Sequence, residues 1–263
     1  MKSIIFALLL FTGIVRAQVY GRPAILRNVG IEQQMDASVP LDDPFTDEQG
    51  HIVTLRQYAG KPIILALVYY QCPSLCNMVL NGVLRAARAI QFAAGQDYQI
   101  IAVSFDARET YPLASEKKRS YVKDYARPEG DSGWHFLTGA DSSSRALADA
   151  VGFHFTYDPV SNQFAHPSAI VMLTGECRVA RYYYGIDYPA RDVKLGLMDA
   201  SGGKIGSPID AVQLFCFHYD AGNGKYGLLI SRVLQLAGLA TLGALVTFML
   251  IMFRRDFHPR RAV

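Results

Sequence analysis

Two cysteines four residues apart, Cys72 and Cys76, are the residues with the clearest chemistry in this sequence. They follow a continuous apolar run at 63–70 and precede a segment whose apolar residues recur at helical spacing. Side chains four residues apart lie on one face of a helix, one turn apart. Because a helix N-terminus lowers the pKa of a nearby thiol, we expect both sulfurs to be available as thiolates. Such a pair forms a reversible disulfide or binds a soft metal, such as Cu(I), zinc or an iron–sulfur centre.

The elements that must position these cysteines alternate between strands and helices. Apolar runs and turn residues predict strands at 63–70, 98–105, 134–137, 169–173 and 179–184, and a hairpin at 45–55. Helical periodicity predicts helices at 74–94, 112–126, 142–151 and from 189 to a stop at 202–203. We expect Gly95 to end the first helix and Asp141 to cap the third. This order predicts an α/β sandwich with a mixed sheet.

A two-sulfur site lacks a third ligand, and His166 is the histidine best placed to supply one. It precedes the strand expected at 169–173 and is followed by Pro167. In a thioredoxin-like sheet, the loop that enters this strand faces the junction that bears the cysteines. His51 lies in a polar turn, while His135 and His154 lie in apolar stretches. Two thiolates and one imidazole are a donor set that copper accepts.

Asp106 directly follows the strand beside the cysteine strand. Functional residues gather at the carboxyl ends of strands in open α/β sheets. Asp106 is therefore a candidate for a residue that binds a metal ligand and orients it, or for a general acid/base in thiol chemistry. A third interpretation, that it caps the turn before the next helix, is equally open.

The composition excludes several classes of protein. The chain is 51% hydrophobic and 19% charged, which argues against intrinsic disorder. Its net charge is +3 and its body contains no basic run longer than three residues, so we expect no nucleic-acid partner. Four cysteines are too few for a small disulfide-built fold.

Both ends of the chain contain apolar segments that predict targeting. Residues 1–17 combine a basic start, an apolar stretch and small residues, the pattern of a secretory signal peptide. Residues 233–253 form a run of twenty-one without a charge, long enough to cross a hydrocarbon core of ~30 Å as a transmembrane helix. Residues 254–263 contain four arginines, which should hold this tail in the cytoplasm.

These segments predict a single-pass protein of the cytoplasmic membrane. Residues 18–232 would then face the periplasm or the extracellular side. This is an oxidising compartment, where free thiols are unusual unless they have a function. We expect 18–44 to be an extended lead-in segment and 45–225 to be the working domain.

Motifs along the domain identify a known family by resemblance. They are Phe45…Asp47-Glu48-Gln49-Gly50, Gly60-Lys61-Pro62, Tyr70-Gln71-Cys72-Pro73-Ser74-Leu75-Cys76, Val103-Ser104-Phe105-Asp106, Leu137-Thr138-Gly139, His166 and Tyr184-Gly185-Ile186-Asp187-Tyr188-Pro189. The residues of these motifs, their order along the chain and the distant histidine resemble those of the Sco/SenC family of copper chaperones for respiratory oxidases. The resemblance covers roughly residues 28–228. Family members with a C-terminal span are also similar at 214–220.

The resemblance implies a thioredoxin-like domain that binds one copper ion, as Cu(I), Cu(II) or both. Its ligands would be Cys72, Cys76 and His166. The implied partner is cytochrome oxidase subunit II, which contains a dinuclear copper centre. Members of the family deliver copper to this centre or keep its thiols reduced. Other copper chaperones or thiol reductants would be further partners.

The sequence departs from the family at two positions. Asn77 stands where many members have a second proline after the cysteine pair, and Pro167 follows the histidine directly. We expect the first change to alter only the start of the helix. The second affects how far His166 reaches.

Three functions are compatible with the two cysteines. A copper chaperone would pass its ion to a partner by ligand exchange. A thiol-disulfide oxidoreductase would need only Cys72 as the attacking thiolate and Cys76 as the resolving thiol. A peroxide-reducing or redox-sensing protein is the third. Three residues between the cysteines, rather than two, and a histidine in the facing loop favour copper delivery.

Cys177 and Cys216 are the remaining cysteines. In an oxidising compartment an even pair is able to form a structural disulfide, but the sequence leaves open whether they meet. Cys216 and His218 would share one face of a strand, which also makes a secondary metal contact conceivable. Burial is the interpretation we favour for Cys216.

Overall fold

A five-stranded mixed sheet forms the centre of the molecule. The computed structural model describes residues 24–72, 75–203, 219–220, 225–226 and 228–256. The strand order is β11-β10-β4-β5-β6, with bounds β4 (Ile63–Val68), β5 (Gln99–Ser104), β6 (Trp134–Leu137), β10 (Ala169–Leu173) and β11 (Val179–Tyr184). β4, β5 and β6 are parallel, whereas β10 is antiparallel to both β4 and β11.

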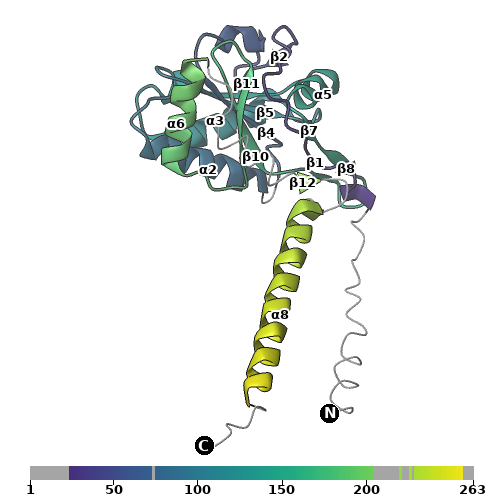
Figure 1. The fold of residues 1–263 in the computed structure, drawn as a ribbon. Helices are drawn as coiled ribbons and strands as arrows, with labels where there is room; N and C mark the ends of the chain where they lie inside the picture. The colour runs from purple at the N-terminus through teal and green to yellow at the C-terminus, as the bar shows by residue number, and fades with distance from the viewer. Residues whose placement is uncertain (1–23, 73–74, 204–218, 221–224, 227, 257–263) are drawn as a thin grey trace, which may run out of the picture.

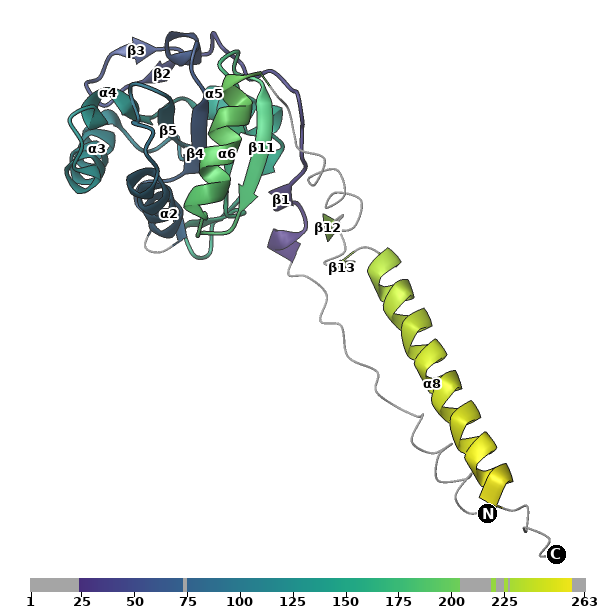
Figure 2. The same cartoon turned by 60° about the vertical axis from the view of Figure 1, so that its left-hand side comes forward.

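Helices cover both faces of this sheet (Figures 1 and 2). Their bounds are α2 (Leu75–Ala89), α3 (Tyr111–Tyr125), α4 (Gly130–Gly133), α5 (Asp141–Ala150) and α6 (Ala190–Ser201). α2 and α3 connect successive parallel strands in one direction, so right-handed crossovers place both on one face. α6 packs beside α2 on that face, while α5 lies on the other (Figure 1).

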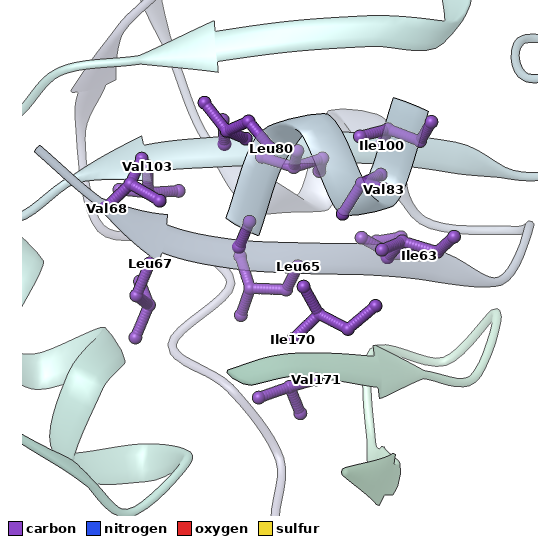
Figure 3. Packing of buried hydrophobic residues seen from close by; sticks show 14 of the residues in the cluster. Ile63, Leu65, Leu67, Val68, Leu80, Val83, Ile100, Val103, Ile170 and Val171 are labelled. Carbon is purple, nitrogen blue, oxygen red and sulfur yellow. The ribbon is translucent and has the colours of Figure 1, made fainter. Parts of the chain in front are cut away.

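The core forms around β4 because all six of its residues are buried. Figure 3 shows Ile63, Leu65, Leu67 and Val68 of this strand between apolar residues of α2, β5 and β10. Burying one such side chain contributes about 1.5–3 kcal/mol. A continuous apolar run is what a parallel strand covered on both faces requires, so the central strand has the position that the sequence predicts.

Short elements complete the described part of the chain. β2 (Phe45–Thr46) and β3 (Ile52–Val53) form the expected hairpin. β1 (Gly30–Ile31) pairs with β7 (Phe153–His154), and β8 (Thr156–Asp158) pairs with β9 (Gln163–Ala165). The remaining elements are the 3-10 helices η1 (Ala24–Leu26) and η2 (Leu55–Tyr58) and the pair β12 (Tyr219–Asp220) and β13 (Lys225–Tyr226). Part of the expected lead-in segment is therefore paired with the body through β1.

Two expected helix ends are wrong. The first helix ends at Ala89 rather than near Gly95, because Arg127 donates hydrogen bonds to the carbonyls of Arg88, Ile90 and Phe92. Those carbonyls are thereby satisfied outside a helix. Asp141 is the first residue of α5 rather than its cap, since its carboxylate binds Arg145 one turn later at 2.7 Å.

The expected targeting segments have different outcomes. Residues 1–17 lie outside the described residues. The helix α8 (Leu228–Asp256) includes the segment 233–253. Among the residues that the structure describes, no helix is long and apolar enough to cross a membrane. The expected span is therefore not supported by the structure.

Candidate metal centre

The two cysteines lie where β4 passes into α2. Cys72 and Cys76 are both buried, and no disulfide joins them in the described chain. The amide of Cys76 donates to Cys72 Sγ at 3.5 Å, and the amide of Tyr69 donates to Cys76 Sγ at 3.4 Å. The strand end and the first helical turn therefore direct both sulfurs into one site.

His166 approaches these sulfurs from the end of the β8–β9 hairpin. Its Nε2 lies 3.3 Å from Cys76 Sγ. Its Nδ1–H donates to the carbonyl of Pro167 at 2.9 Å, which fixes the tautomer and leaves the Nε2 lone pair directed at the cysteines. Pro167, which the sequence singles out as a departure, thus orients the ring. The predicted ligands Cys72, Cys76 and His166 are brought together.

Aromatic rings enclose the imidazole. The ring centroid of Phe105 lies 5.3 Å from that of His166, and those of Tyr69 and Phe153 lie 5.9 and 6.3 Å away. Phe164, on β9, also packs against Phe105. An apolar wall around a histidine excludes water and strengthens electrostatic interactions inside the site.

The protonation states differ from those expected from the helix terminus. Burial raises the pKa of the Cys76 thiol, and the amide of Tyr69 opposes this only in part. The expected thiolate at Cys76 is therefore wrong, because desolvation outweighs the helix N-terminus. Burial also lowers the pKa of His166, so its imidazole is neutral and able to act as a ligand at neutral pH.

The donor set fits a soft or borderline metal ion. The two sulfurs and one imidazole nitrogen lie within 4.8 Å of one another. Thiolates favour Cu(I), and imidazole suits copper in either state. Because Cys76 is a buried thiol, metal binding must release its proton.

Asp106 makes contacts of a different kind. Its Oδ1 accepts from the amide of Arg108 at 3.0 Å, and its carboxylate also accepts from Arg108 Nε and Nη2, each at 2.7 Å. Among the described hydrogen bonds of Asp106, none joins it to Cys72, Cys76 or His166. Three roles were considered for Asp106, and the structure shows the last of them: its carboxylate caps the turn that precedes α3.

Three further residues lie beside the site, and only Asn77 was noted in the sequence, as a departure from the family. Glu109 accepts from the amides of Tyr70 and Gln71, each at 2.7 Å. Asn77 Nδ2 donates to the carbonyl of Cys72 at 3.1 Å, and Lys117 Nζ donates to Asn77 Oδ1 at 2.9 Å. An acidic residue shortly after Asp106 was the available hint for Glu109.

The other cysteines do not extend this centre in the described residues. Cys177 is buried and is a free cysteine in a turn, with φ of 58°. Burial raises its pKa. Cys216 and His218 lie outside the described residues, so the disulfide and the secondary metal contact stay predictions.

Comparisons with known proteins agree with this arrangement. A sequence model of the SCO1/SenC family matches residues 34–194. The chain therefore belongs to the SCO1/SenC family. Among curated proteins, none matches it.

Solved structures share the fold. A protein from Aquifex aeolicus VF5 is 25% identical, with a TM-score of 0.58 over 67% of this chain and 98% of that chain. A SCO1/SenC family lipoprotein from Bacillus anthracis str. Ames is 14% identical, with a TM-score of 0.53 over 64% and 98%. ScoI from Arabidopsis thaliana, crystallised with copper bound, is 18% identical, with a TM-score of 0.50 over 61% and 96%. The expected α/β, thioredoxin-like fold with a mixed sheet is confirmed.

Proposed function

We propose that this protein is a copper chaperone that binds one copper ion through Cys72, Cys76 and His166. The observation that carries the proposal is the convergence of two sulfurs and one oriented imidazole nitrogen within 4.8 Å. Membership of the SCO1/SenC family and the copper-bound Arabidopsis thaliana relative support it. Copper is the cargo of this site and passes on by exchange of its ligands.

The chain's own groups define how copper is taken up. Cys76 gives up its proton as the ion binds, and His166 keeps its Nδ1–H on the Pro167 carbonyl while Nε2 acts as the ligand. The rings of Phe105 and Tyr69 limit access of water. An incoming partner thiolate is a strong competitor for copper held in this way.

The proposed client is the dinuclear copper centre of cytochrome oxidase subunit II. This assignment rests on the family resemblance of the motifs. We also propose that residues 233–253 anchor the domain in the cytoplasmic membrane and that the domain faces the periplasm or the extracellular side. The run of twenty-one uncharged residues and the four arginines at 254–263 support that orientation.

A thiol-disulfide oxidoreductase is the second candidate. The sulfurs of Cys72 and Cys76 lie within 4.8 Å of each other, so they are close enough in sequence and space for exchange chemistry. Disulfide exchange does not require the 3.3 Å approach of His166 Nε2 to Cys76, and a buried thiol with a raised pKa reacts slowly. Copper binding therefore accounts for more of the site.

Copper stoichiometry of the full chain in detergent tests the proposal. We expect about one copper per chain in the parent, and loss of copper in Cys72→Ser and His166→Ala. His154→Ala is the matched control, because His154 lies 3.8 Å from Glu32 and is partly exposed. Copper retained in both site variants would contradict the ligand set. A parent without copper, but with a disulfide that exchanges with thiols, would establish the second candidate instead.

A further inference from the structure

One loop, residues 105–110 between β5 and α3, touches both segments that carry the proposed ligands. On the cysteine side, Glu109 binds the amides of Tyr70 and Gln71 and accepts from Ser104 Oγ at 2.6 Å. These amides belong to the segment that leads into Cys72. The loop therefore fixes the strand end from which the cysteines project.

On the histidine side, Arg108 binds the β8–β9 hairpin. Its Nη1 donates to Asn162 Oδ1 at 2.8 Å, in the turn of that hairpin. Its guanidinium also lies over the rings of Tyr157 and Phe164, 5.1 and 5.6 Å from their centroids. These two aromatic residues are directly opposite each other across the hairpin. Arg108 thus contacts the turn and both strands.

Asp106 holds Arg108 in this position. Two parallel hydrogen bonds of 2.7 Å join the Asp106 carboxylate to Nε and Nη2 of Arg108. Asp106 is buried, whereas the Arg108 side chain is 53% exposed. A bidentate pair of this kind fixes the direction of a guanidinium as well as its distance.

The β8–β9 hairpin depends on such contacts for its place. β8 and β9 form a two-stranded sheet of their own in the described chain. An isolated two-stranded hairpin is marginally stable in water. His166 is the residue directly after β9, so movement of the hairpin moves the imidazole relative to Cys76.

We propose that Arg108, held by Asp106, is a positioning residue that keeps His166 within reach of Cys76. The inference rests on the proposed copper site. Two thiolates suffice for soft Cu(I), whereas Cu(II) relies more on the imidazole. Loss of Arg108 therefore weakens Cu(II) binding more than Cu(I) binding.

Amide hydrogen exchange of the copper-free full chain tests the positioning directly. We expect Arg108→Gln to speed exchange in 156–158 and 163–165 by about five- to tenfold, as loss of an ion pair and a cation–π contact implies. Arg108→Lys keeps the charge over the rings but not the bidentate pair, so it restores protection in part. Arg145→Gln is the matched control, because Arg145 pairs with Asp141 and lies over the ring of Phe155 without contacting the hairpin turn.

Copper titration of the same variants gives the second measurement. We expect Cu(II) affinity to fall about tenfold or more in Arg108→Gln, and Cu(I) affinity to change less than about threefold. Unchanged hairpin exchange in Arg108→Gln overturns the positioning role, whatever the copper result. An equal loss of both ions overturns the selective effect. A parent that binds no copper removes the proposed function, while the exchange result still decides whether Arg108 holds the hairpin.

Discussion

Two groups of ionisable side chains are buried in this domain, and they differ in what balances their polar and charged atoms. The metal centre contains Cys72, Cys76 and His166. The second group, which we call the charged cluster, contains Glu48, Lys118 and His135. Both draw residues from elements distant in sequence, and both are mostly shielded from water.

The charged cluster is neutralised inside the protein. Lys118 Nζ forms an ion pair with Glu48 and lies 3.5 Å from Asp131. Glu48 also accepts from the amide of Phe136 at 3.2 Å, and His135 Nε2 lies 3.1 Å from the Gln99 amide oxygen. Opposite charges and amide donors therefore satisfy one another within the cluster.

The metal centre instead gathers electron-pair donors. Cys76 and His166 approach each other as a thiol and a neutral imidazole, and among the described residues no ion pair joins His166 to Asp or Glu. A buried charge that has its own counter-charge is tolerated in a fold and is costly to strand by removing its partner, whereas converging sulfur and nitrogen donors suit a bound cation.

The largest effect on stability should come from Lys118→Met. This change leaves the Glu48 carboxylate buried without its cation, so we expect the free energy of unfolding to fall by about 3–5 kcal/mol. Urea denaturation measures the loss. Copper stoichiometry should stay as in the parent.

A second substitution separates lost charge pairing from lost packing at Lys118. Glu48→Gln in the Lys118→Met background removes the stranded charge and keeps an oxygen for the amide of Phe136. We expect it to recover most of the lost stability. A loss below about 1 kcal/mol in Lys118→Met alone, against the 3–5 kcal/mol typical of a broken buried pair, would mean that water reaches the cluster.

The charged cluster should also make stability depend on pH through His135. Burial lowers the pKa of His135 to about 4, with Glu48 opposing and Lys118 reinforcing the shift. The unfolded chain binds this proton near pH 6.5, so stability rises with pH between about 4 and 6.5 and is lost as pH falls through that window. We expect this contribution to be at most about 3 kcal/mol.

Urea unfolding at several pH values isolates the histidine. The difference between the parent and His135→Gln should grow between pH 4 and 6.5, since carboxylates contribute equally to both proteins. His154→Gln is the control, because the His154 side chain is 42% exposed. Parallel pH profiles for the parent and His135→Gln would assign the slope to other groups.

These two groups also show what the sequence was able to predict. Cys72, Cys76 and His166 were predictable because their types are rare and their positions flank strongly apolar strands. β4 was predictable because a strand buried on both faces is apolar at every position. The β8–β9 hairpin was missed, because each strand has three residues and little apolar signal.

The electrostatics were harder to predict than the elements. The thiol pKa of Cys76 was expected to fall, and burial reverses the direction. Lys118 and Glu48 are separated by seventy positions in sequence, so no local pattern marks them as a pair. Arg108 and Glu109 likewise acquire their roles from contacts across the site that spacing alone does not encode.

Glu109→Gln should have an intermediate effect, on the cysteine side of the metal centre. The substitution presents an NH₂ group to one of the two amides that the carboxylate now accepts from. Leaving a buried donor unsatisfied costs about 1–3 kcal/mol. We expect a loss of stability in that range and weaker binding of Cu(I), measured by urea unfolding and by competition with a Cu(I) chelator.

A glutamate on α3 provides the control for Glu109. Glu116 is exposed, so Glu116→Gln should leave stability and Cu(I) affinity as in the parent. Normal Cu(I) affinity in Glu109→Gln would show that the cysteine segment holds its shape without the carboxylate.

The smallest effect should come from Asn77→Ala. The change removes the hydrogen bonds of Asn77 to the Cys72 carbonyl and to Lys117. Those bonds are worth about 0.5–1.5 kcal/mol each, while alanine regains about 0.5 kcal/mol of helix propensity in α2. The part-buried position further reduces the cost, so we expect a net change within about 1 kcal/mol by urea unfolding and unchanged copper affinity.

Lys117→Met removes one of the two bonds of Asn77 and serves as its control. If Asn77→Ala costs more than about 2 kcal/mol, above the typical worth of a single hydrogen bond, and Lys117→Met does not, the bond to the Cys72 carbonyl is what shapes the cysteine turn. The turn would then be held from the helix as well as from Glu109. If both substitutions are nearly neutral, the site is held from the strand side, and the residue at position 77 is free to vary. Proline fits the same position because the first turn of a helix needs no backbone amide donor there.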